Sequence, residues 1–117
     1  MNYYFNIDKD KSYVEILGDK PECGVLNNFF NSIFISNDIE LIYKIRDILS
    51  GNIPNYEMIY NIKYISVNKE SVMINLDAYS SEGVTTYKTD EFLKILEDYV
   101  NEYCKMMEVD ESYYKIK

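Results

Sequence analysis

Carboxylates are the most concentrated group of side chains in this chain that could take part in chemistry. Residues 70–111 contain eleven Asp and Glu against three Lys, a balance of -8 that equals the net charge of all 117 residues. Paired carboxylates can transfer protons, bind calcium or attract a cationic partner. The sequence has no histidine, which excludes hydrolytic triads built on an imidazole, and it has no DxDxDG calcium loop. The carboxylates therefore favour a surface that attracts cations.

Five residues are the candidates for a partner-binding surface. Asp98 and Glu102 are four residues apart, so on a helix they share one face, where like charges repel each other unless a cation neutralises them. Asp77 and Tyr79 belong to a segment with a strand pattern, and Glu82 follows that segment. We expect these side chains to contact a basic partner. A solvated helix face and an ordinary exposed sheet face are the alternatives.

The same charge balance argues against other partners. An acidic field repels nucleic acid and anionic membranes, and the short basic segment 43–46 is too isolated to be a nucleic-acid patch. No apolar run approaches the roughly 20 residues that span a bilayer, and the start of the chain lacks the pattern of a signal peptide. Cys23 and Cys104 have no CxxC spacing, which favours reduced thiols. We expect a cytoplasmic protein that is not an enzyme and has no cofactor or metal.

The first half of the chain predicts a hairpin and a helix. Apolar residues alternate in the segments 3–7 and 13–17, and the charged segment between them favours a turn. Residues 22–36 fit a short buried helix as well as a helical turn followed by a strand. Residues 38–50 have apolar positions at helical spacing, with Asn37 and Glu40 placed as a capping box.

The second half predicts a meander of three strands and a final helix. The strand segments are 58–67, 72–79 and 84–88, joined by short polar connections. In the middle strand, Val72, Ile74, Leu76 and Ala78 are expected to face the helices, and the second face carries Met73, Asn75, Asp77 and Tyr79. That mixture is closer to a contact surface than to a solvated face. Thr89 is positioned to cap a helix that continues to about residue 106.

Together these elements predict one α+β domain over residues 1–117. Its antiparallel sheet comprises the N-terminal hairpin and the three-stranded meander, and two main helices pack on one face.

Several short segments along the chain match positions of a known family: MNYYF at the start, Leu49-Ser50-Gly51, Lys63-Tyr64, Asn68, Glu70, Val72-Met73-Ile74, Asp90-Glu91-Phe92-Leu93 and Tyr99. In these positions the chain resembles the YacL family of small bacterial proteins and the YacL-like immunity proteins, of the CdiI type, from contact-dependent growth inhibition systems. The likeness covers most of the length and consists mainly of structural positions.

The resemblance implies a cytosolic inhibitor that binds and neutralises the C-terminal toxin domain of a CdiA-like effector, often a nuclease. Such toxins are commonly cationic because they hold a phosphate backbone, which agrees with the acidic balance. Two other hypotheses stay open: a YacL-like housekeeping interaction protein without a toxin partner, and a small enzyme using Tyr or carboxylate chemistry. A deep pocket with carboxylates of raised pKa would favour the enzyme.

Overall fold

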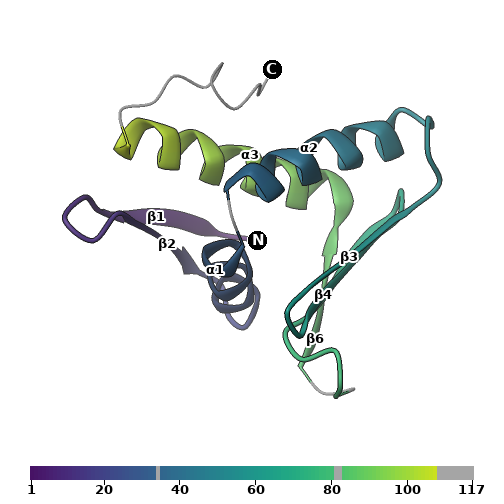
Figure 1. Ribbon diagram of the computed structural model, residues 1–117, viewed down its shortest axis with the longest axis horizontal. Coiled ribbons are helices and arrows are strands. Elements are labelled where there is room, and N and C mark those ends of the chain that lie inside the picture. Colours follow the sequence, from purple (N-terminus) through teal and green to yellow (C-terminus); the bar gives the residue numbers. More distant parts are fainter. Residues whose placement is uncertain (34, 81–82, 108–117) are drawn as a thin grey trace.

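The computed structural model describes residues 1–33, 35–80 and 83–107 and shows an α+β fold with two antiparallel sheets. Figure 1 shows α2 and α3 running side by side, with the hairpin and α1 at one end and the four-stranded sheet at the other. The predicted α+β fold class is confirmed, but the hairpin and the meander form two separate sheets where one was predicted. The elements are β1 (Tyr3–Asp8), β2 (Tyr13–Gly18), α1 (Glu22–Ser32), α2 (Ile35–Leu49), β3 (Tyr56–Tyr60), β4 (Lys63–Val67), β5 (Ser71–Asn75), β6 (Val84–Lys88) and α3 (Thr89–Met106).

The N-terminal hairpin forms as predicted. β1 and β2 pair antiparallel from Tyr3 opposite Gly18 to Asp8 opposite Tyr13. The Asp8 carboxylate accepts the Lys11 N–H at 3.2 Å, which supports the turn. Gly18 has a φ of 144°, a value that side chains rarely allow, and an added Cβ would clash with the backbone of residue 2.

Helix α1 covers the free edge of the hairpin with asparagine side chains. Asn27 Oδ1 accepts the Ile16 N–H at 3.0 Å, and Asn31 Nδ2 donates to the Val14 carbonyl at 3.2 Å. These amides occupy the place of a third strand and satisfy backbone groups that an edge strand otherwise exposes. Of the two structures that the sequence allowed for residues 22–36, the helix is the one that forms.

Helix α2 begins earlier than predicted. It starts at Ile35, so Asn37 lies inside the helix and the predicted capping box at Asn37 and Glu40 is wrong. The apolar stripe was read correctly, because Ile42, Ile45 and Ile48 are fully buried or nearly so.

The meander has four strands in the order β3-β4-β5-β6, where three were predicted. The segment 58–67 is divided by a two-residue turn at Asn61 and Ile62. Asn61 adopts a φ of 56°, which asparagine tolerates better than most residues. Alternating Val and Ile residues of β4 and β5 (Ile65, Val67, Val72 and Ile74) are buried against the helices.

The prediction that the middle strand continues to Tyr79 is also wrong. β5 ends at Asn75, whose side-chain oxygen accepts the Asp77 N–H at 3.0 Å, and Asp77 in turn accepts the Tyr79 N–H at 3.0 Å. Asn and Asp side chains that bind the backbone two residues on favour turns over strands. Ala78, predicted to face the helices, is exposed.

Helix α3 follows the predicted stripe. Phe92, Leu96 and Tyr99 are buried, and the Phe30 ring of α1 lies 5.1 Å from the Tyr99 ring, centre to centre. Thr89 does not cap the helix as predicted: Lys88 is the N-cap, and the Thr89 hydroxyl donates to the Asn68 carbonyl at 2.8 Å. The buried side chains form one hydrophobic cluster.

None of the helices in the part of the chain that the structure describes has the length and apolar character needed to cross a membrane.

Candidate protein-binding site

Two of the five predicted binding residues lie in the turn that follows β5. Tyr79 is 88% exposed, and the Asp77 carboxylate holds the Tyr79 backbone in place through the hydrogen bond described above. The Ala78 N–H donates to the Ile62 carbonyl at 2.6 Å, which ties this turn to the β3–β4 turn. Glu82 lies outside the described residues. The turn therefore presents a tyrosine on a hydrogen-bonded support.

The other two predicted residues lie on α3 and have partners within the chain. The Asp98 carboxylate accepts the Tyr3 hydroxyl at 2.7 Å and the Lys94 ammonium at 3.0 Å. Burial, followed by this hydrogen bond to Asp98, raises the pKa of Tyr3. The hydrogen bond that Lys94 donates to Asp98 raises the pKa of Lys94. Glu102 lies 3.6 Å from Lys105 Nζ.

These two groups do not form one surface. In Figure 1 the turn after β5 is at the lower end of the four-stranded sheet, and the C-terminal half of α3 is at the upper left. A neighbouring α3 carboxylate, Glu97, is also paired, 2.9 Å from Arg46. Much of the helix charge is thus matched by the chain's own cations, so α3 is a weaker docking surface than its sequence indicates.

The outer face of the four-stranded sheet has no described element packed on it. Figure 1 shows the helices on one side of this sheet and open space on the other. Strand pairing places Ile59 opposite Tyr64, Tyr64 opposite Asn75, and Asn75 opposite Val84. Because side chains alternate along a strand and Ile65 and Ile74 are buried, this row lies on the face away from the core.

We call this face, comprising Ile59, Tyr64, Met73, Asn75 and Val84, the outer sheet face. Ile59 is 66% exposed and Val84 is 43% exposed, while Tyr64 and Met73 are half-buried by their neighbours. The next row on this side of the sheet, Glu57, Ser66, Met73 and Thr86, is mostly polar. The face thus combines Tyr, Met and exposed apolar side chains with polar ones, as many protein contact surfaces do. Of its five residues, the sequence analysis singled out only Met73 and Asn75.

The missed residues had a signal in the sequence. Residues 56–60, YEMIY, do not alternate cleanly, but Asn61 is a residue type that favours turns, and it supplies the turn that separates β3 from β4. With the segment divided there, the alternation places Ile59 and Tyr64 on one face.

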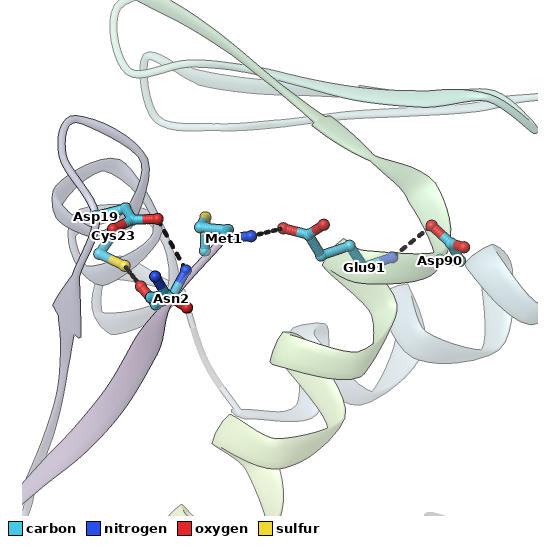
Figure 2. A network of polar contacts seen from close by, with 6 residues as sticks. All are labelled: Met1, Asn2, Asp19, Cys23, Asp90 and Glu91. Carbon is cyan, nitrogen blue, oxygen red and sulfur yellow. Dashed lines mark hydrogen bonds and ion pairs between the residues drawn. The ribbon is translucent and has the colours of Figure 1, made fainter.

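A second polar group of residues fixes the start of the chain (Figure 2). The Met1 ammonium lies 3.3 Å from the Glu91 carboxylate, and the Asn2 N–H donates to Asp19 at 2.8 Å. The Cys23 thiol donates to the Asn2 carbonyl at 3.6 Å, and burial, followed by the nearby Asp19 charge, raises the pKa of Cys23. A raised pKa keeps the thiol protonated, which does not suit a nucleophile.

A cleft of about 320 Å³ borders this network, with walls formed by Met1, Asp19, Glu22, Tyr87, Lys88 and Glu91. Asp19 and Glu91 already hold the first two residues of the chain. These carboxylates thus join β1 to α1 and α3.

Asp38 is the one described carboxyl group whose burial raises its pKa well above the usual value. It is 1% exposed, and neither oxygen has a hydrogen-bond partner among the described residues. A substrate cannot reach a carboxyl group enclosed in this way. The described residues also contain no group of three or more His, Cys, Asp or Glu that could hold a metal ion.

No family model matches this chain, and no curated protein or solved structure matches it. The comparisons therefore neither support nor refute the resemblance to the YacL-like immunity proteins.

Proposed function

We propose that this protein is a stoichiometric inhibitor that binds a basic protein through its outer sheet face. The resemblance to YacL-like immunity proteins suggests the class of that partner: the C-terminal toxin domain of a CdiA-like effector, neutralised in the cytoplasm. The observation that carries the proposal is the cross-strand row Ile59, Tyr64, Asn75 and Val84 on the uncovered face, with Ile59 and Val84 exposed, on a chain with a net charge of -8.

The cross-strand row supports tight binding because few residues usually dominate the affinity of an interface. Aromatic side chains at the centre of an interface are common hot spots. Only a few residues of an interface cost more than about 2 kcal/mol of binding free energy when they are truncated to alanine. Tyr64 lies within the row, between Ile59 on β3 and Asn75 on β5. It is therefore the residue that we expect to contribute most.

The net charge supports the choice of a basic partner. A charge of -8 attracts cations over long range and accelerates their encounter with the protein, with an effect that falls as salt rises. The ion pairs on α3 do not change the sum, because every charge contributes to the field at a distance. A basic toxin would thus be captured quickly and then held by apolar contacts.

The test is co-expression with the protein encoded immediately upstream, followed by co-purification and a cell-survival assay. We expect the wild-type chain to co-purify and to protect the cells. Tyr64→Ala should weaken binding by at least about tenfold. Tyr4→Ala is the matched control, because Tyr4 is a strand tyrosine that is 62% exposed on the other sheet. No binding by the wild-type chain, or equal effects of the two variants, would overturn the proposal.

A further inference from the structure

β3 is an edge strand of the four-stranded sheet, and the hydrogen-bond pattern shows which of its backbone groups point outward. The Asn68 N–H donates to the Ser71 carbonyl at 3.0 Å, so these residues are a hydrogen-bonded pair that continues the β4–β5 ladder. Hydrogen-bonded pairs alternate along an antiparallel ladder. Ser66 and Tyr64 therefore direct their backbone groups toward β5, and Ile65 directs its groups toward β3.

The same alternation then fixes the orientation of β3. Met58, opposite Ile65, and Tyr60, opposite Lys63, point their backbone groups toward β4. Glu57 and Ile59 therefore point their N–H and C=O groups away from the sheet. No described residue accepts or donates hydrogen bonds at these outward groups.

Asn27 and Asn31 of α1 occupy the free edge of β2. An uncovered edge is a template for pairing with another strand. The four-stranded sheet has two edges, β3 and β6. On β6 the same alternation leaves Thr86 and Lys88 pointing outward, so that edge carries an exposed cation. The β3 edge carries an exposed carboxylate, Glu57, beside Ile59 of the outer sheet face, which makes it the edge better suited to a basic strand.

Building on the proposed function, we infer that the basic partner adds one of its own strands to β3. The added strand hydrogen-bonds to the backbone of Glu57 and Ile59 and extends the cross-strand row of the outer sheet face by one position. Glu57 is exposed and has no ion pair among the described residues, so it favours a strand with Lys or Arg opposite it.

Glu57 also favours this partner over a second copy of the chain. Two copies pairing through β3 would bring their Glu57 residues close together, and like charges on neighbouring strands repel. The net charge of -8 on each copy adds to this repulsion. Charge complementarity therefore selects a basic strand.

Residue-resolved amide exchange of the wild-type chain tests the inference without any substitution. In the free protein, the amides of Met58 and Tyr60 should exchange slowly, and those of Glu57 and Ile59 should exchange fast. After addition of the protein encoded immediately upstream, Glu57 and Ile59 should become protected as well. If they still exchange fast in a complex that forms, strand addition is wrong.

A pair of variants provides an independent test. Proline at an outward-facing edge position leaves the sheet ladder intact but removes the outward N–H. Glu57→Pro should therefore weaken binding by about tenfold relative to Glu57→Gln, which removes the same charge and keeps the N–H. Thermal unfolding of both variants verifies that they fold.

The outcomes separate the two proposals. If the wild-type chain does not bind the upstream protein, the proposed function fails. If it binds, and Glu57→Pro binds as well as Glu57→Gln, the proposed function stands and the strand addition is overturned.

Discussion

The buried carboxyl group of Asp38 makes the stability of this protein depend on pH in a direction that can be worked out. Asp38 is in the first turn of α2 and is 1% exposed. Burial raises its pKa in the folded protein, whereas an unfolded chain ionises Asp near pH 3.9. Between these two values the folded state binds more protons than the unfolded state. Stability is therefore greatest below about pH 3.9 as far as this group is concerned, and it falls as pH rises toward the folded pKa.

Asp38→Asn removes this dependence with little change in shape. Both carboxyl oxygens lack partners among the described residues, and an Asn amide in the same place would be equally buried but cannot ionise. The substitution therefore removes the cost of ionising a buried carboxyl group, which is about 1.4 kcal/mol for each pH unit between the unfolded and folded pKa. We expect Asp38→Asn to raise the free energy of unfolding by at least about 1 kcal/mol at pH 7. For a chain of this size, each kcal/mol corresponds to about 4 °C in Tm. The gain should shrink toward zero near pH 4.

Urea unfolding measured between pH 4.5 and 8 gives the comparison directly. Glu40→Gln is the matched control, because it removes one negative charge two residues along the same helix from an exposed side chain. Only Asp38→Asn should flatten the pH dependence. A gain that is equal at both ends of the pH range, or a loss of stability at neutral pH, would refute the argument that ionisation of Asp38 opposes folding.

Two further predictions concern the packing of α1 against the hairpin and against α3. Asn27→Ala should lower the free energy of unfolding by about 1–3 kcal/mol, because the Ile16 N–H is left without its acceptor at the hairpin edge, and chemical denaturation measures the loss. Phe30→Ala should cost about 3–5 kcal/mol in the same assay, because the ring is fully buried between Phe92 and Tyr99; a loss below about 1 kcal/mol would contradict that packing.

Patterns of burial were the part of the fold that the sequence predicted well. The hairpin, the stripe of α2 and the stripe of α3 follow from apolar spacing, because a half-buried element must repeat its apolar residues at its own period. The errors fall where a short polar side chain decides the backbone. Asn61 divides one predicted strand into two, and Asn75 ends β5 with a side-chain hydrogen bond.

The candidate site was harder to predict because it depends on strand register. Ile59, Tyr64 and Val84 are far apart in the sequence and meet only through pairing across four strands. The acidic residues of α3 were visible, but sequence spacing does not show that Tyr3, from the opposite end of the chain, binds Asp98. The sequence showed that α3 is acidic, but only the structure shows that contacts within the chain pair several of its carboxylates.

The turn after β5 owes its shape to its own short side chains and one bond to the neighbouring turn. Asn75 and Asp77 bind backbone amides two residues ahead, and the bond from Ala78 to Ile62 closes the arrangement; none of these groups belongs to the hydrophobic cluster. Mutations at the tip, including Tyr79, can therefore accumulate without disturbing the interior. The sequence of this turn can thus vary while the scaffold is inherited unchanged.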